Sequence, residues 1–239
     1  MPKIIQLDRH VADLIAAGEV VERPASAVKE LVENSIDAGA KNITIELQNG
    51  GMTFLRITDD GCGMDPVDAR TAFLRHATSK VREKDDLDAI LTLGFRGEAL
   101  ASISAVSRVD LITRTADSSI GTHYSSEGGS DVEIEDAGCP LGTTITARDL
   151  FFNVPARRKF LRTNATEGRY INELLTRLAL SRPDVRFKLV SNDKEVLSTP
   201  GNGSLFDAIT ALYGKKVSDE LLKVDFTGTD VQITGYIGK

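Results

Sequence analysis

The sequence predicts an α+β fold in which helices lie against a mixed β-sheet. Alternating apolar residues, which are typical of half-buried strands, recur in neighbouring runs separated by turn-forming residues. Amphipathic helical segments stand in groups between these runs instead of following every strand, which favours separate layers. The 239 residues, 41% of them hydrophobic, are enough to bury a substantial core.

The first predicted element is a helix at residues 24–38, because Pro24 suits its first turn and Gly39 suits the position after its end. At 100° per residue, the stretch "KELVENSIDAGA" divides into two sides. The polar side chains within one arc of about 100° are Glu30, Glu33, Asn34 and Asp37. The packing side consists of Val28, Leu31, Val32, Ser35 and Ile36. The polar side is either a solvated acidic surface or a surface that faces a polar ligand.

A hairpin follows the helix, with strands at 42–48 and 52–59 joined at the strong turn signal Asn49-Gly50. The later elements are expected in this order: a helix at 65–76, a polar connection at 78–94, a helix at 97–106, strands at 108–115, 122–126, 131–135 and 143–149, helices at 156–162 and 166–180, and strands at 185–190 and 195–198. Helices grouped between hairpin-connected strands predict a mixed sheet with helices layered against it.

The end of the second strand carries a candidate ligand-binding carboxylate. In "RITDDGCGM" the alternation places Asp59 on the core side with Leu55 and Ile57. A buried carboxylate is costly unless a donor meets it, and a purine amino group is one such donor. Gly61 and Gly63 would then let the backbone approach that ligand and adopt positive φ. The alternative is an aspartate that ends the strand and caps a turn.

A weak phosphate-binding signal lies in "LGFRGEALASISAVS", where Gly94 and Gly97 lead into a helix whose first amides suit an anion. The spacing matches neither a P-loop nor a dinucleotide fingerprint. The connection at 78–94 is long enough to act as a lid. Its start, "RHATSK", offers two hydroxyls and an ammonium for the same anion: Thr78, Ser79 and Lys80. His76 is interpreted as structural, because no pair of histidines has metal-ligand spacing.

Charge is unevenly distributed along the chain. The formal net charge is −6, yet residues 153–188 hold nine Lys and Arg against three Asp and Glu. This basic segment either contacts a polyanion or consists of solvated helix side chains. The second alternative stays open because no interleaved aromatic residues indicate base stacking. Cys62 and Cys139 give no disulfide framework, and neither a membrane span nor a signal peptide is evident. We therefore expect an intracellular protein, located in the cytoplasm or nucleoid if bacterial and in the nucleus if eukaryotic, without membrane partners.

The turn-rich stretch "STPGNGS" at 198–204 is typical of a linker. A helix at 205–212 and strands at 221–226 and 230–236 follow, which is too little for a domain. We expect residues 1–200 to form one domain and residues 201–239 to be the incomplete start of a second α/β domain.

Four stretches together resemble one family: "IAAGEVVERPASAVKELVENSIDAGA", "RHATSK", "GFRGEALASISAV" and "DLFFNVPARRKFL". Their order resembles the GHKL ATPases of gyrase, heat-shock chaperones, histidine kinases and MutL, and their details resemble the MutL family of DNA mismatch-repair proteins. The resemblance covers nearly the whole chain. It implies the Bergerat fold, a two-layer sandwich with a mixed, largely antiparallel sheet and helices on one face, which binds ATP and Mg²⁺.

The resemblance implies a role for each polar position. Glu30 matches the general base that activates water, and Asn34 matches the Mg²⁺ ligand. Asp59 matches the adenine-reading carboxylate, assisted by Thr143. Gly61, Gly63 and Met64 would line the base pocket. The residues that would close over the phosphates are Thr78, Ser79, Lys80, Gly94, Phe95, Arg96, Gly97, Glu98, Ala99 and Leu100. Glu33 and Asp37 are expected to be solvated or to lie behind the catalytic residues, and Asp60 departs from the asparagine common in the family.

The family also implies a switch. ATP binding would order the lid and pair two N-terminal domains, from a second copy or a paralogue, with the segment before Pro24 crossing to the partner. Hydrolysis would release this ATP-timed clamp, which couples a mismatch-recognition protein to downstream repair enzymes. Contact with the DNA backbone, without sequence preference, would involve Arg157, Arg158, Lys159 and Arg162.

A lysine from the second domain reaches the γ-phosphate in this family, so a chain ending at Lys239 is expected to bind ATP but hydrolyse it poorly. Two other functions stay open. One is another GHKL class, such as a chaperone or topoisomerase subunit, against which "GFRGEAL" argues. The other is a non-catalytic DNA-binding scaffold, against which the presence of both Glu30 and Asn34 argues.

Overall fold

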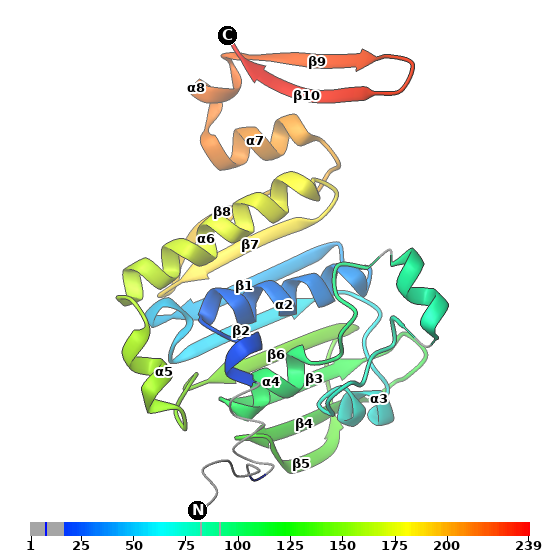
Figure 1. The fold of residues 1–239 in the computed structure, drawn as a ribbon, viewed down its shortest axis with the longest axis vertical. Coiled ribbons are helices and arrows are strands. Elements are labelled where there is room, and N and C mark those ends of the chain that lie inside the picture. The colour runs from blue at the N-terminus through cyan, green and yellow to red at the C-terminus, as the bar shows by residue number, and fades with distance from the viewer. Residues whose placement is uncertain (1–7, 9–16, 82, 91) are drawn as a thin grey trace, which may run out of the picture.

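Residue 8 and residues 17–81, 83–90 and 92–239 are described in the computed structural model shown in Figure 1. An eight-stranded sheet with the order β5-β4-β3-β6-β2-β1-β7-β8 forms its centre. Its strands are β1 (Asn42–Gln48), β2 (Phe54–Asp59), β3 (Arg108–Arg114), β4 (Gly121–Glu127), β5 (Ser130–Ala137), β6 (Gly142–Arg148), β7 (Arg186–Ser191) and β8 (Lys194–Ser198). Only the β1–β7 pair among these is parallel, so the sheet is mixed and largely antiparallel.

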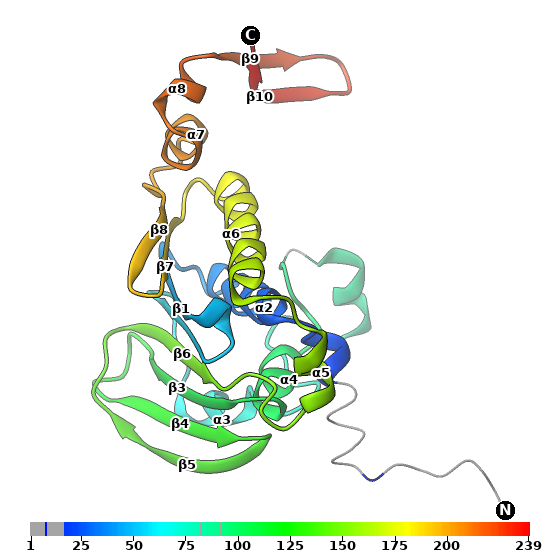
Figure 2. The same ribbon diagram turned by 90° about the vertical axis from the view of Figure 1, so that its left-hand side faces the viewer.

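Helices cover one face of this sheet, as the side view in Figure 2 shows. They are α2 (Pro24–Asp37), α3 (Pro66–Thr71), α4 (Ala99–Ala105), α5 (Pro155–Phe160) and α6 (Asn164–Ser181). The two-layer α+β sandwich predicted for the chain is therefore confirmed.

The core lies between α2 and the middle of the sheet. Leu31 of α2 is buried there, and the antiparallel register pairs Ile45 with Ile57 and Ile57 in turn with Ile145. Burying such side chains stabilises the fold by about 1.5–3 kcal/mol each. Because side chains alternate along a strand, this register also fixes which face Asp59 occupies at the end of β2.

Local backbone geometry shifts some element boundaries from those predicted. The strand expected from residue 52 begins at Phe54, because residues Asn49–Gly51 form a 3₁₀ turn and Met52 is still helical. The helix expected from residue 97 begins at Ala99, because Gly97 has a positive φ of 63° that does not fit a helix. The helix expected over 65–76 ends at Thr71, and a 3₁₀ helix, η2 (Lys84–Ala89), lies inside the polar connection.

The C-terminal elements lie beyond the large sheet (Figure 1). They are α7 (Leu205–Tyr213), α8 (Lys215–Ser218), β9 (Leu221–Thr227) and β10 (Gln232–Gly238). The short α8 was not predicted. Strands β9 and β10 pair only with each other within the described residues, and α7 contacts α6 and β8.

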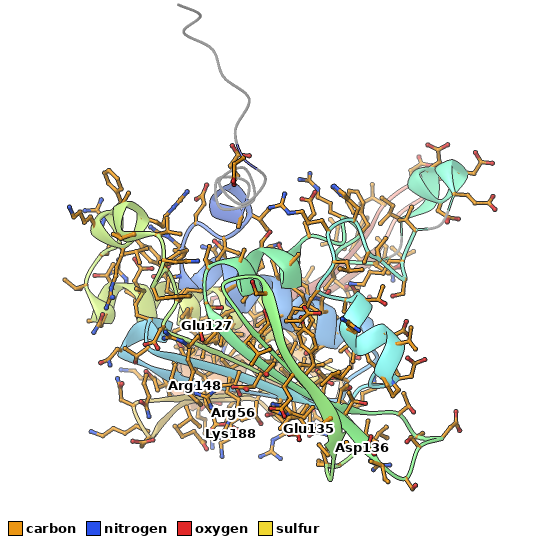
Figure 3. The ribbon with its side chains drawn as sticks, turned by 90° about the horizontal axis from the view of Figure 1, so that it is seen from below. Arg56, Glu127, Glu135, Asp136, Arg148 and Lys188 are labelled. Atoms are coloured by element: carbon orange, nitrogen blue, oxygen red, sulfur yellow. The ribbon has the colours of Figure 1, made fainter. Side chains whose placement is uncertain are left out.

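Charged side chains cover the sheet face opposite the helices, where Figure 3 labels Arg56, Arg148 and Lys188. Arg56 pairs with Glu46 at 2.5 Å, Arg148 pairs with Asp110, and Lys188 pairs with a carboxylate on β8 at 3.3 Å. In the described part of the chain, no helix has the length and apolar character needed to cross a membrane. Most of the segment before Pro24, which was expected to cross to a partner, lies outside the described residues.

Candidate nucleotide-binding site

The carboxylate of Asp59 stands between helix α2 and the loop that follows β2. The Ser35 hydroxyl of α2 donates a hydrogen bond of 2.6 Å to Asp59 Oδ2, and the Gly61 amide donates one of 2.9 Å to Oδ1. Ser35 was predicted only as a packing residue. It is buried as expected, but it also fixes the carboxylate, and the one signal for this role was a hydroxyl on an otherwise apolar helix side.

Burial raises the pKa of Asp59 above its usual range, and the adjacent Asp60 carboxylate adds to this rise. Hydrogen bonds from Ser35, Gly61 and Thr143 oppose the rise by stabilising the charged form. A partly desolvated carboxylate of this kind gains from an external donor, because it retains acceptor capacity that the protein does not fill.

Strand β6 places Thr143 directly opposite Asp59 in the ladder. The Thr143 hydroxyl lies 3.1 Å from that of Thr113 on β3, and the Met64 amide donates a 2.9 Å hydrogen bond to Thr113 Oγ1. No sequence pattern indicated a role for Thr113, which is fully buried and joins two residues expected at the base pocket. This hydroxyl pair thus connects the loop after β2 to the middle of the sheet.

The two glycines of this loop serve different purposes. Gly63 has a φ of 70°, and a Cβ there would lie 2.0 Å from the Arg114 carbonyl oxygen, so no larger residue fits. Gly61 packs against the end of α2, where a Cβ would lie 2.9 Å from the Ala38 Cβ. Positive φ was expected at both positions and is present only at Gly63. At both glycines the close neighbour is a protein atom, whereas the sequence predicted a close approach to a ligand.

The C-terminal end of the polar helix face meets the lid, residues 78–94, of which 82 and 91 lie outside the described residues. Lys80 Nζ donates hydrogen bonds of 2.8 Å to Asn34 Oδ1 and 2.6 Å to Asp37 Oδ2. The Asn34 amide oxygen therefore already faces a cationic group.

Asp37 accepts further hydrogen bonds from the far end of the lid. The amides of Leu93 and Gly94 donate to its carboxylate at 3.0 Å and 3.3 Å. The side chain of Asp37 is only 8% exposed and that of Lys80 only 18% exposed. Of the two options expected for Asp37, the solvated one is therefore wrong, and the sequence did not predict its contact with the lid.

The two stretches expected at the phosphates lie against each other. A Cβ on Gly97 would approach the Ala77 carbonyl oxygen to 2.4 Å, and Gly94 lies beside Lys80. Thr78 Oγ1 accepts a hydrogen bond of 3.1 Å from the Lys80 amide. The remaining predicted residues are placed as follows: Ser79 is exposed, Phe95 and Arg96 contact each other, Glu98 lies 3.4 Å from His76, Ala99 begins α4, and Leu100 packs on the core.

Glu30 projects from α2 with 31% of its side chain exposed, and Lys29 Nζ lies 3.4 Å from its Oε1. The same ammonium donates a 2.9 Å hydrogen bond to Glu33. Glu33 was expected to be solvated or to lie behind the site, and it is buried and paired, so the solvated option is wrong. An accessible carboxylate on the face that carries Asn34 suits a general base.

Asn34 is the one predicted metal ligand, and its donor chemistry fits Mg²⁺. Its oxygen accepts from the Lys80 ammonium at 2.8 Å, which shows that a cation fits at this position. Among the described residues, no group of three or more His, Cys, Asp or Glu side chains forms a cage that holds a metal by itself. Mg²⁺ bound mainly by water and substrate phosphates needs only one or two protein ligands.

The predicted DNA-contacting residues lie on and after α5, where no residue is fully buried. Arg158, Lys159 and Arg162 are exposed, whereas Arg157 is half-buried near Gly18. Phe160, among these cations, is 83% exposed. The absence of interleaved aromatics inferred from the sequence is therefore wrong for this short helix, since one aromatic ring stands between the cations.

A family model described as "Histidine kinase-, DNA gyrase B-, and HSP90-like ATPase" matches residues 22–135. This match, on a two-layer sandwich with these polar positions, defines the class of the chain: it contains a GHKL ATPase domain.

Solved structures and curated relatives narrow the class to one family. The structure "Aquifex aeolicus MutL ATPase domain complexed with ADP" is 34% identical, with a TM-score of 0.69, 86% of this chain covered and 73% of that one. "Crystal Structure of N terminal domain of a DNA repair protein" is 29% identical, with a TM-score of 0.78 and coverages of 98% and 74%. The DNA mismatch repair protein MutL of Symbiobacterium thermophilum is 54% identical over all 239 residues.

The chain belongs to the MutL family of DNA mismatch-repair proteins, as its motifs predicted. It spans 38% of the length of the Symbiobacterium protein and 37% of the MutL of Agathobacter rectalis, with which it is 52% identical.

Proposed function

We propose that this site binds Mg²⁺-ATP and hydrolyses the bond between its β- and γ-phosphates. The observation that supports this most directly is the Lys80 ammonium held at the Asn34 amide oxygen, on the same helix that fixes Asp59 through Ser35. Adjacent residues near the C-terminal end of this helix thus hold a carboxylate site, through Ser35, and a cation site, at Asn34, which suits a nucleotide that contacts both. The ADP complex of the Aquifex MutL domain supports the same choice of ligand.

At the base end, Asp59 accepts a hydrogen bond from the exocyclic amino group of adenine. Ser35 and Gly61 hold the carboxylate so that it does not rotate away when the nucleotide leaves. The burial that raises its pKa also strengthens this hydrogen bond, because water competes less for the acceptor. Thr143 assists from the neighbouring strand, and Gly61, Gly63 and Met64 line the pocket.

At the phosphate end, Asn34 would hold Mg²⁺, which when bound would neutralise phosphate charge and polarise the oxygens bonded to the phosphorus atom under attack. Glu30 orients the attacking water and takes its proton, and it is accessible enough to do so. Lys80 contributes a point charge to the phosphates, together with the hydroxyls of Thr78 and Ser79. The amides of residues 94–100 close over the same oxygens.

The wider activity extends this proposal to the whole protein. Nucleotide binding orders the lid and pairs two N-terminal domains, from two copies or from paralogues, and hydrolysis separates them. The resulting clamp couples a mismatch-recognition protein to downstream repair enzymes. Residues 1–200 form the nucleotide-binding domain, and residues 201–239 begin a second domain whose lysine completes the site.

The exposed cations on and after α5 contact the DNA backbone in this proposal. Their side chains face solvent and no base-specific pattern accompanies them, so contact with phosphates is their main contribution. The test is the dependence of binding on salt. Replacing both Arg158 and Lys159 with glutamine is expected to reduce the slope of log K against log [salt] by about two, because two phosphate contacts are lost.

The nucleotide site is tested by titrating Mg²⁺ and a non-hydrolysable ATP analogue into wild type, Asp59→Asn and Glu30→Ala, with the heat of binding as readout. Binding by wild type and Glu30→Ala, but not by Asp59→Asn, is expected. In single-turnover assays, Glu30→Ala is expected to slow hydrolysis by about 10²–10⁴-fold.

Other outcomes distinguish the alternatives. If no variant binds the analogue, either the second-domain residues are required for affinity or the site is a non-catalytic scaffold, and the titration repeated on a longer chain separates these. If a mismatch-recognition protein does not alter turnover but a chaperone client or supercoiled DNA does, a different GHKL activity replaces the one proposed.

A further inference from the structure

Asp37, the last residue of α2, collects hydrogen bonds from both ends of the lid. Its Oδ2 accepts from Lys80 Nζ at 2.6 Å and from the Gly94 amide at 3.3 Å. Its Oδ1 accepts from the Leu93 amide at 3.0 Å. Two of these donors lie thirteen or more residues from the third along the chain, so a single carboxylate joins the two ends of the segment.

This contact is shielded from solvent on both sides. The Asp37 side chain is 8% exposed and the Lys80 side chain is 18% exposed. Charge-assisted hydrogen bonds are about twice as strong as neutral ones, and removing one partner of a buried pair leaves an uncompensated charge. The Asp37 contacts therefore differ from the solvated ion pairs elsewhere on α2, such as Lys29 with Glu30.

The three donors at Asp37 form the kind of set that binds a phosphate: an ammonium and two backbone amides at a glycine-rich turn. Lys80 at the same time donates to Asn34 Oδ1, the oxygen proposed to hold the metal. The carboxylate of Asp37 thus takes the place of an anion, and the ammonium of Lys80 takes the place of a cation.

We infer that Asp37 is a positioning residue that stands in for the phosphate before nucleotide binds, holding Lys80 and the 93–94 amides in place over Asn34. This inference rests on the proposed nucleotide site. Nucleotide binding is then an exchange: the ammonium and the amides leave the carboxylate for phosphate oxygens, and Asn34 Oδ1 is released to a metal ion. No covalent step is involved.

The test uses nucleotide-free protein, with Asp37→Asn as the variant and Glu33→Gln as the matched control. Asparagine has the same shape but loses the charge and one of the two acceptor oxygens. Glu33 lies one turn earlier on α2, is equally buried, and pairs with Lys29 instead of the lid. Circular dichroism establishes that both variants are folded before the comparison.

Two measurements follow the two kinds of donor at Asp37, the backbone amides and the Lys80 ammonium. Hydrogen exchange of the Leu93 and Gly94 amides is expected to become about ten-fold faster in Asp37→Asn, since a charge-assisted hydrogen bond is lost. Acylation of Lys80 by an amine-reactive ester, measured against the exposed Lys223 as an internal reference, is expected to rise by a similar factor. Glu33→Gln is expected to change neither rate.

Unchanged exchange and unchanged acylation in a folded Asp37→Asn would overturn the inference. If Asp37→Asn does not fold, Asn34→Ala replaces it, because this variant removes the second partner of Lys80 and leaves Asp37 in place. Lys80 acylation is then expected to rise while the 93–94 amides stay protected, and loss of both protections would contradict the role assigned to Asp37.

A final measurement separates this inference from the nucleotide proposal. Adding Mg²⁺ and the non-hydrolysable ATP analogue to wild type is expected to keep Lys80 and the amides protected, now by phosphate, so that Asp37→Asn regains protection when nucleotide is bound. If wild type does not bind the analogue, the titration on the longer chain decides the nucleotide proposal, while the nucleotide-free result still decides the role of Asp37.

Discussion

The two ends of the site on α2 are built in different ways. At the base end, Asp59 belongs to a strand whose register with β1 and β6 is set by the core, and its partners Ser35 and Gly61 lie next to rigid elements. At the phosphate end, Lys80 and the 93–94 amides belong to a connecting segment and are held by one carboxylate. The base end is therefore preformed, whereas the phosphate end consists of contacts that a ligand can replace.

Replacing Asp59 with asparagine is expected to have the largest effect on binding. The amide presents a donor where adenine also presents a donor, so affinity for the ATP analogue should fall by about 10² or more. Stability should not fall, because burial raises the pKa of Asp59, which means that its ionised form costs free energy in the folded state at pH 7. Calorimetric titration and the melting temperature measure the two effects.

Asp60→Asn is the matched control, because the change is the same and the position is adjacent. Asp60 accepts hydrogen bonds from the amides of Lys41 and Asn42 at 2.7 Å and 2.8 Å, away from the pocket. Its affinity for the analogue should stay within about two-fold of wild type. A loss equal to that of Asp59→Asn would show that the base end is not where the adenine binds.

Thr113→Val tests whether the base end is as rigid as its hydrogen bonds indicate. The variant removes the acceptor of the Met64 amide in a fully buried environment, which should cost about 1–3 kcal/mol of the free energy of unfolding. Urea denaturation measures this. Thr144→Val, on the sheet face opposite the helices, is the control and should change the free energy of unfolding by less than about 0.5 kcal/mol. Equal effects would contradict the role of Thr113.

Lys80→Met is expected to weaken binding by about ten-fold, because one charge-assisted contact with phosphate is lost. The preference for the adenine analogue over the guanine analogue should persist, since the base end is untouched. Lys41→Met, which removes an ammonium paired with Asp184 at 3.1 Å, is the control. A change in base preference in Lys80→Met would mean that the two ends do not act separately.

The smallest effect is expected on the free energy of unfolding at His123, on the sheet face opposite the helices. Partial burial disfavours the charged ring, but hydrogen bonds with Glu135 and Asp110 raise the pKa of His123. Its contribution to stability is therefore fully present below the unfolded pKa of about 6.5 and is lost as the pH rises through the folded pKa. Urea denaturation across this window should show a decline that is absent in His123→Gln, with nucleotide affinity unchanged in that variant.

The sequence predicted the two faces of α2 but not the partners of each face. Helical periodicity placed Ser35 inside and Asn34 outside, and strand alternation placed Asp59 on the core side, because these depend on local geometry. The hydrogen bonds from Ser35 to Asp59, from Lys80 to Asp37 and from Met64 to Thr113 join positions 24, 43 and 49 residues apart. Such pairs depend on the tertiary arrangement, which periodicity in a single sequence does not encode.

Charge statistics were similarly incomplete. They identified the basic segment but treated Glu167 as one of its few acids. In the structure this side chain is completely buried, and its Oε1 accepts a hydrogen bond of 3.0 Å from the Arg162 amide. Sequence composition counts charges without distinguishing those that face solvent from those that organise the backbone.

The fixed register of β2 limits how the length of the chain can change. Asp59 lies opposite Ile43 on one side and Thr143 on the other. One residue inserted within β2 before Asp59 would send the carboxylate to the opposite face, and two would restore the face but move it along the strand by about 7 Å. Insertions and deletions among relatives should therefore be rare in this hairpin and more frequent at turns remote from the pocket, such as Gly128-Gly129.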